Sequence, residues 1–251
     1  MDFDRGTMNQ RVLLDLKKRS TVGLFFYVVL SIICVIAGDF YQRHQMLSLI
    51  FLSANTVICL FRLIHLKITE KSGERHAGVN KRIFFGSVIV TALIWGVTLA
   101  LITLLKEERA MQLLMTVCIC GLCAGGVVAF IPHRPLSICF NIAMMLPVVA
   151  VLLVTGANIP LASMIFLFSV YMALMAVRGN REYWDALENE YLLEMKSGEL
   201  SRLSNTDVLT GLYNRRFFDA MLDAEWKRSG RNNSLLSVVI FDLDQDRKSV
   251  V

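Results

Sequence analysis

Charged residues are scarce in this sequence. Only 19% of its 251 residues are Asp, Glu, Lys or Arg, while 55% are hydrophobic. In an average soluble domain about 25% of the residues are charged and about 45–50% are hydrophobic. The apolar excess lies almost entirely between Thr21 and Val177. This uneven distribution excludes a uniformly soluble protein and predicts a membrane domain followed by a soluble one.

The apolar part also has few residues suited to a metal, redox or ion-transport site. Its four histidines fall in different segments, and it lacks the chain of intramembrane carboxylates that marks an ion path. All six cysteines lie in apolar segments, where Cys behaves as a small hydrophobe. Cys118-x-Cys120-x-x-Cys123 permits a metal or redox interpretation, but Gly121 and Gly125 beside it favour close helix packing.

The formal net charge of +5 does not indicate a nucleic-acid partner. The basic residues gather at the ends of apolar segments, where Lys and Arg set membrane topology and meet anionic headgroups. We therefore expect membrane lipids, and no nucleic acid, among the partners of this region.

Six apolar segments approach the roughly 20 residues needed to cross a bilayer as a helix. They cover residues 21–38, 46–66, 83–105, 111–132, 136–156 and 158–177. Basic residues are concentrated before the first segment, between the second and third, and after the sixth. The positive-inside rule then predicts that both termini are cytoplasmic. The short connections on the other side leave no room for a folded extracellular domain.

Four polar residues inside the second and fifth segments need an explanation. Arg62 and His65 lie near the cytoplasmic end of the second segment, so we expect their side chains to snorkel to the interface. Asn55 and Asn141 lie deeper. Each either contacts a ligand or bonds a neighbouring helix, and the second interpretation is favoured.

Residues 178–207 lack proline and are rich in Glu, Leu and Arg. Trp184, Leu187, Tyr191 and Met195 recur at steps of three or four, as one stripe of a helix does. We expect an amphipathic connecting helix that forms a short coiled coil between two subunits of a homodimer. The alternative is a single helix lying against its own domain or the membrane.

The segment after this helix combines a turn, a helix and a strand. Gly211 interrupts the helical pattern, and Asn214 is placed to cap a helix with an apolar face. Residues 235–243 form an apolar run typical of a buried strand, and Asp242 and Asp244 stand at its end. Ligands collect at the carboxyl edge of such strands in α/β sheets.

Two motifs in this segment resemble a known family. The first consists of Asp207, Leu209, Thr210, Gly211, Leu212, Asn214, Arg215 and Arg216, and the second is Asp242-Leu243-Asp244. Their sequences and separation resemble the opening of a GGDEF domain, the catalytic domain of bacterial diguanylate cyclases. The resemblance covers about residues 200–245, roughly the first quarter of that domain. The expected fold is therefore mainly α: a six-helix transmembrane bundle, a connecting helix and the start of an α/β GGDEF domain.

The resemblance implies an enzyme that condenses two GTP molecules into cyclic di-GMP, with Mg²⁺ or Mn²⁺. It implies that the Asp242 carboxylate and the Leu243 carbonyl are metal ligands, and that the first motif is mainly structural. It also implies a location in the bacterial inner membrane. The guanine-binding positions and the GG[DE]EF hairpin are absent from the sequence, so no catalytic set is complete and we expect this chain to be inactive.

The sequence divides accordingly into five parts. We expect a cytoplasmic N-terminus (1–20), a six-span sensor domain (21–177), a signalling helix (178–206), a truncated GGDEF domain (207–245) and a tail (246–251). The tail can be encoded by a common sequencing-adapter sequence, so we interpret it as non-native, with a genuine truncation or frameshift as the alternative. The alternative function is a non-catalytic sensor with a degenerate GGDEF module. In one form of this alternative, a phosphodiesterase domain follows the module.

Overall fold

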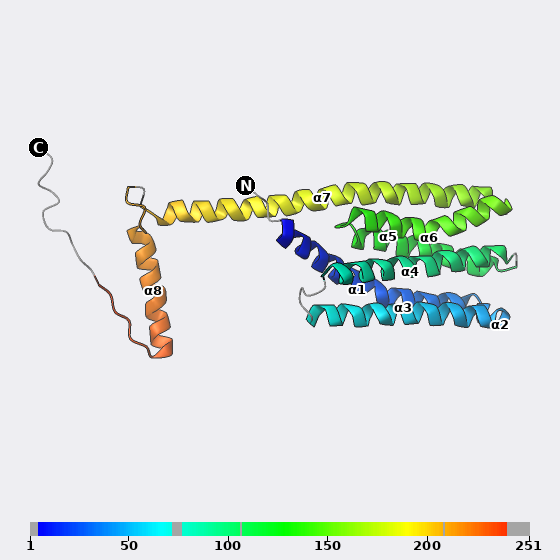
Figure 1. Cartoon of the computed structure of the whole chain (residues 1–251), viewed down its shortest axis with the longest axis horizontal. Helices are drawn as coiled ribbons and strands as arrows, with labels where there is room; N and C mark the ends of the chain where they lie inside the picture. The colour runs from blue at the N-terminus through cyan, green and yellow to red at the C-terminus, as the bar shows by residue number, and fades with distance from the viewer. Residues whose placement is uncertain (1–4, 72–76, 106, 208, 240–251) are drawn as a thin grey trace, which may run out of the picture. The chain divides into compact units, whose positions relative to one another are not determined.

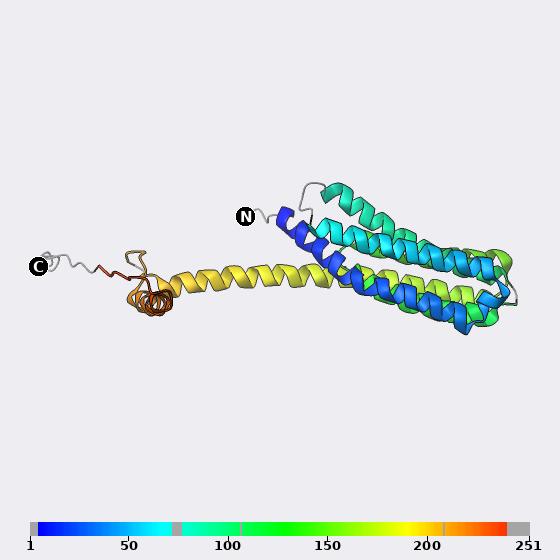
Figure 2. The same cartoon turned by 90° about the horizontal axis from the view of Figure 1, so that it is seen from below.

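The computed structural model describes residues 5–71, 77–105, 107–207 and 209–239 (Figures 1 and 2). Among these residues the chain forms helices and no strand longer than an isolated bridge. The helices are α1 (Arg5–Ala37), α2 (Phe40–Arg43), α3 (Gln45–Lys71), α4 (Ala77–Leu104), α5 (Arg109–Ala129), α6 (Arg134–Thr155), α7 (Ile159–Asn205) and α8 (Arg215–Asn232).

The six predicted spans are confirmed as six helices long and apolar enough to cross a membrane: α1, α3, α4, α5, α6 and α7. The largest extensions beyond the predicted spans are at α1 and α7, and α3 and α4 extend by less. α1 begins earlier, at Arg5, and α7 continues through the segment predicted as the connector to Asn205. The predicted fold class, mainly α with a six-helix bundle, is confirmed, and the α/β part is not visible among the described residues.

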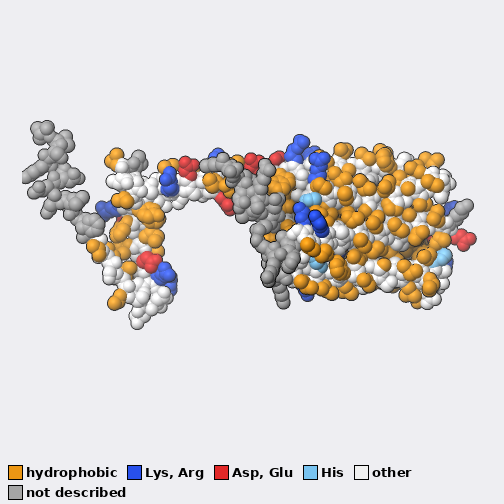
Figure 3. Space-filling view, viewed as in Figure 1, with side chains coloured by type: hydrophobic (Ala, Val, Ile, Leu, Met, Phe, Trp, Pro, Cys, Tyr) orange, Lys and Arg blue, Asp and Glu red, His pale blue; other side chains and the backbone are white. Residues whose placement is uncertain are grey.

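The chain divides into two compact units, residues 1–186 and 187–251. In the first unit α4 packs on α6, and α1 packs on both α3 and α5. The outer surface of the bundle is covered mainly by hydrophobic side chains (Figure 3). A surface of this kind is costly in water and suits lipid, so the first unit has the character of a membrane domain.

Small residues allow two close helix contacts in the bundle, and they are not the ones that the sequence predicted. A Cβ atom at Gly96 of α4 would lie 2.6 Å from the Met144 carbonyl oxygen of α6, and Gly126 of α5 lies against the Phe140 ring. A Cβ at Gly121 or Gly125 would meet no atom within 4 Å. The prediction that this pair packs against a helix is therefore wrong.

A buried carboxylate joins α2 to the start of α5. Glu108 accepts hydrogen bonds from Arg43 Nε at 2.7 Å and from Arg43 Nη2 at 2.9 Å, and His44 Nε2 lies 3.3 Å from its Oε1. Arg43 Nη2 also donates to the Gly38 carbonyl at 2.6 Å. The hydrogen bonds to Glu108 raise the pKa of Arg43. This cluster fixes one end of the bundle.

Asn55 of α3 is fully buried and bonds two other helices. Its Nδ2 donates to the Tyr27 carbonyl of α1 at 2.9 Å and to Ser31 Oγ at 3.1 Å. Its Oδ1 accepts from Trp95 Nε1 of α4 at 3.1 Å. Because no water competes in a bilayer core, polar side chains there must be paired inside the protein. Asn55 therefore links three helices, as the favoured interpretation predicted.

Asn141 of α6 has the same role on the other side of the bundle. Its Nδ2 donates to the Ser169 carbonyl of α7 at 2.8 Å, and its Oδ1 accepts from Ser169 Oγ at 3.3 Å. The Cys123 thiol of α5 donates to the same Oδ1 at 3.2 Å. Cys123 is thus a packing and hydrogen-bonding residue, and the described residues contain no group of three or more His, Cys, Asp or Glu that could hold a metal.

Replacing Asn55 with Leu is expected to lower the free energy of unfolding by about 1–3 kcal/mol. Two bonds to α1 are lost and the buried Trp95 N–H loses its acceptor. Denaturant unfolding of the detergent-solubilised chain, followed by tryptophan fluorescence, measures the change. The matched control is Thr98→Val in α4, because the Thr98 hydroxyl bonds the Ile94 carbonyl of its own helix; it should change stability by less than about 0.5 kcal/mol. Equal losses in the two variants would contradict the linking role.

Candidate functional site

The first motif singled out in the sequence forms a compact turn between α7 and α8. The Asp207 N–H donates to the Leu212 carbonyl at 2.7 Å, and the Gly211 N–H donates to the Asp207 carbonyl at 2.9 Å. At the base of the turn the Asn214 N–H donates to the Asn205 carbonyl at 2.8 Å. These hydrogen bonds hold the two ends of the turn together, and the chain changes direction between α7 and α8 (Figure 1).

The Asp207 carboxylate organises the interior of this turn. Its Oδ1 accepts from the Thr210 N–H and the Thr210 hydroxyl, both at 2.9 Å, and from the Leu209 N–H at 3.2 Å. These bonds favour the ionised form. The Thr210 N–H and then the Thr210 hydroxyl are the main causes that lower the pKa of Asp207 below its ordinary value.

Gly211 and Asn214 serve the two ends of the turn. Gly211 has φ of +71°, a left-handed conformation in which a side chain is strained. Asn214 caps α8: its Oδ1 accepts from the Phe217 N–H at 3.0 Å, while its Nδ2 donates to the Ser204 carbonyl at 2.7 Å. Arg216 Nη2 donates to Ser204 Oγ at 2.7 Å, which also ties α8 to the end of α7.

The other motif residues point away from this network. The Leu209 and Leu212 side chains are 95% and 70% exposed. Arg215 is exposed and lies 3.8 Å from Asp219 within α8. The motif thus divides into residues whose side chains or backbone hold the turn and residues whose side chains are presented outward.

The proposed metal ligands Asp242 and Leu243, with Asp244, lie outside the described residues. Residues 235–239, the described part of the predicted strand, adopt no regular secondary structure. Phe218, Met221 and Trp226 on the apolar face of α8 are exposed, and α8 buries none of its residues. In the described part of the second unit, Leu187 is the one buried hydrophobic residue, so a hydrophobic core is not assembled there.

The first turns of the predicted connector are held by the bundle within the first unit. Asn180 Nδ2 donates to the Ile131 carbonyl, in the turn between α5 and α6, at 2.7 Å. The Tyr183 hydroxyl donates to Asp15 Oδ2 of α1 at 2.7 Å, and Arg19 lies over the Tyr183 ring at 5.6 Å. α1 and the α5–α6 turn therefore both contact α7 directly.

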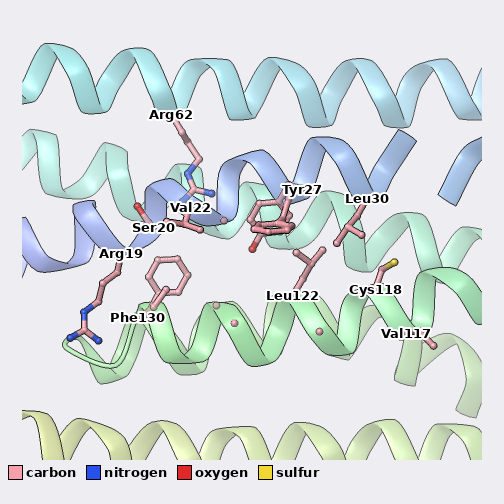
Figure 4. Close-up of a pocket in the computed structure, with 16 residues that line it drawn as sticks. Arg19, Ser20, Val22, Tyr27, Leu30, Arg62, Val117, Cys118, Leu122 and Phe130 are labelled. Carbon is pink, nitrogen blue, oxygen red and sulfur yellow. The ribbon is translucent and has the colours of Figure 1, made fainter. Parts of the chain in front are cut away.

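Arg62 of α3 is a second candidate site residue, and the prediction that it snorkels is wrong. Its side chain is buried, 2% exposed, and reaches a cavity between α1 and α5 (Figure 4). Its Nη1 donates to Thr91 Oγ1 of α4 at 3.3 Å. The sequence signal for this site was a basic residue, Arg62, inside an apolar span. Only the packing of α1 on α3 in the structure shows that the Arg62 side chain is buried.

Acidification is expected to open the turn at Asp207. Because the folded pKa is lowered, the carboxylate stabilises the turn fully above the unfolded pKa of about 3.9. That stabilisation is lost as pH falls toward the lowered folded value. The amide proton shift of Thr210, followed by NMR during acid titration of the chain in detergent, should report this transition. The Asp207→Asn variant should lack it, and a midpoint at or above the ordinary Asp value would contradict the hydrogen-bonded geometry.

Comparison with family models matches residues 204–247 to the model described as "Diguanylate cyclase, GGDEF domain". Comparison with the curated proteins and with the solved structures finds no significant match. The matched range contains the whole turn, α8 and the Asp242–Asp244 motif. Residues 204–247 therefore carry part of a GGDEF domain, the domain of the diguanylate cyclase family, and six apolar helices precede it in the chain.

Proposed function

We propose that the intact gene product is a signal-responsive diguanylate cyclase, which makes cyclic di-GMP from two molecules of GTP. The observation that carries this proposal is the GGDEF match at residues 204–247 after six helices of membrane-spanning length. The bundle is the part that receives the stimulus, and the GGDEF domain is the part that responds to it.

In the proposed reaction each of two facing domains holds one GTP. The 3′-hydroxyl of each GTP attacks the α-phosphate of the other, two phosphodiester bonds form and two pyrophosphates leave. Divalent metal, Mg²⁺ or Mn²⁺, neutralises triphosphate charge in reactions of this kind. The Asp242 carboxylate and the Leu243 carbonyl are the proposed ligands in this chain, and both are oxygen donors of the type that Mg²⁺ prefers.

The arrangement of two subunits controls the rate of such a reaction, because each site contributes one of the two reactants. We place the subunit contact along residues 178–207. The helical geometry of α7 supports this, as do the exposed side chains of Tyr191 and Met195, which belong to its apolar stripe. A signal that shifts α7 at the contacts that Asn180 and Tyr183 make with the bundle would change how the two GGDEF domains face each other.

The basic residues at the ends of the spans support an orientation with both termini in the bacterial cytoplasm, where GTP is available. The GGDEF domain then lies beside the inner membrane. The 251-residue chain itself is expected to be inactive, because one carboxylate and one carbonyl cannot hold two metal ions and a triphosphate.

The cyclase proposal is tested by reading the native gene past codon 245 and expressing its full product. The full product should form cyclic di-GMP from GTP in membranes, and Asp242→Ala should reduce the rate by about 100-fold or more. The matched control is Asp223→Ala on α8, where Asp223 is exposed and bonds Lys227 at 2.7 Å; it should retain activity. A full product with an intact hairpin and no activity, or a degenerate hairpin, would favour the non-catalytic sensor.

Cysteine cross-linking tests the proposed subunit contact in the 251-residue chain. With the six native cysteines replaced by alanine, Met195→Cys should form disulfide-linked dimers in membranes. Lys196→Cys, about 100° further round the helix, should form few. Equal yields at the two positions would argue against a specified interface.

The orientation of the chain in the membrane is measured in the same variant that lacks the six native cysteines. A membrane-impermeant maleimide added to intact cells should label Glu107→Cys and leave Lys196→Cys unlabelled. The reverse pattern would overturn the proposed topology.

A further inference from the structure

A cavity of about 540 Å³ lies in the first unit, between α1, α3 and α5. Its volume is within the roughly 300–1,000 Å³ typical of small-molecule sites. Gly121 and Gly125 form part of its wall on α5, and a Cβ at either position would meet no atom within 4 Å. The two glycines thus keep this space open.

The cavity is polar at one end and apolar at the other. Arg19, Ser20 and Arg62 line the polar end, and Leu30 and Val117 line the apolar end (Figure 4). Ser20 and Leu30 are ten residues apart on α1, which corresponds to about 15 Å along the helix axis. This is about half of the roughly 30 Å hydrocarbon core of a bilayer, and so about the reach of one acyl chain.

The cavity is accessible from the surface that faces lipid. Val22 and Phe26 of α1 and Val117 of α5 line it, and all three are exposed, Val117 by 72%. A molecule dissolved in the membrane can therefore enter between α1 and α5 without crossing water.

Arg62 supplies an unbalanced positive group to this cavity. Its Nη1 bonds Thr91 Oγ1, but its buried Nε has no hydrogen-bond partner. No carboxylate among the described residues pairs with it. A buried cation without an anion is strongly disfavoured. In Figure 4 the guanidinium points from α3 toward Ser20 and Val22, where a ligand head could meet it.

We propose that this cavity binds an amphiphile with one anionic head and one aliphatic chain reaching into the membrane. The head pairs with Arg62, with Ser20 and Arg19 close by, and the chain lies along Gly121, Gly125 and Leu30. A free fatty acid offers its only chain and an anionic phospholipid offers one of its two chains, so both provide the anionic head and the chain that the cavity requires. A neutral lipid lacks the group that Arg62 requires.

A bound ligand would affect α7, because residues of the cavity wall lie at or beside the contacts that hold this helix. Arg19 lines the cavity and lies over the Tyr183 ring, and Phe130 lines it one residue before Ile131, whose carbonyl binds Asn180. A regulatory effect of the ligand rests on the proposed cyclase function, whereas binding does not.

Native mass spectrometry of the 251-residue chain, released from delipidated micelles, tests binding directly. Palmitate should bind saturably, and hexadecanol, which has the same chain and no charge, should bind at least about tenfold more weakly. A parallel titration with phosphatidylglycerol identifies the source: tighter binding of palmitate indicates a fatty acid, and tighter binding of phosphatidylglycerol indicates a membrane lipid. Both results support the proposal.

Two variants separate the head from the chain. Arg62→Met should weaken binding of the anion by at least about tenfold and leave hexadecanol unchanged. Gly125→Leu should fill the cavity and abolish binding of both, whereas Gly86→Leu should not. Gly86 is the matched control, because it lies on α4 away from the cavity and also has open space at its Cβ.

Equal binding of palmitate and hexadecanol would overturn the proposal, as would equal binding by the Gly125→Leu and Gly86→Leu variants. Because these experiments measure binding by the bundle, failure here leaves the cyclase proposal standing. Failure of the cyclase assay likewise leaves this site intact.

Discussion

Polar side chains inside the bundle need hydrogen-bond partners within it. Two asparagines satisfy this requirement by bonding to neighbouring helices. Asn55 joins α1, α3 and α4, and Asn141 joins α5, α6 and α7. Hydrophobic contacts between helices give little specificity when the surroundings are equally apolar. Each amide therefore adds specific links within one set of three helices, while packing of α4 on α6 and of α1 on α5 joins the two sets.

Much of this organisation could be predicted from the sequence, because it depends on local patterns. Span length and hydropathy predicted six helices, and the capping role of Asn214 follows from its place before an apolar helical stripe. The first motif of the family resemblance consists of residues that the structure brings into one turn and the start of α8. The hydrogen bonds of this turn connect residues close in sequence, so its motif carries nearly all the information that the turn requires.

Contacts between distant residues could not be predicted in the same way. Arg62 looked like a snorkelling residue because its distance from the end of the span was known and the covering helix was not. Gly121 and Gly125 have the spacing of a packing motif, yet it is Gly126 that meets a neighbouring ring. Successive residues of a helix point about 100° apart around its axis, so Gly125 and Gly126 lie on different faces. The sequence alone does not say which face a partner will cover.

The bond between Tyr183 and Asp15 has a consequence for the order in which the protein is made. It joins residues 168 positions apart, so the first helix enters the membrane long before its partner has been synthesised. Until then, Asp15 must be satisfied by water or by headgroups. The bundle can thus close at this end only after α7 has been inserted. In contrast, the hydrogen bonds around the turn after α7 join residues at most 12 positions apart in the sequence. This turn can therefore form as soon as it leaves the ribosome.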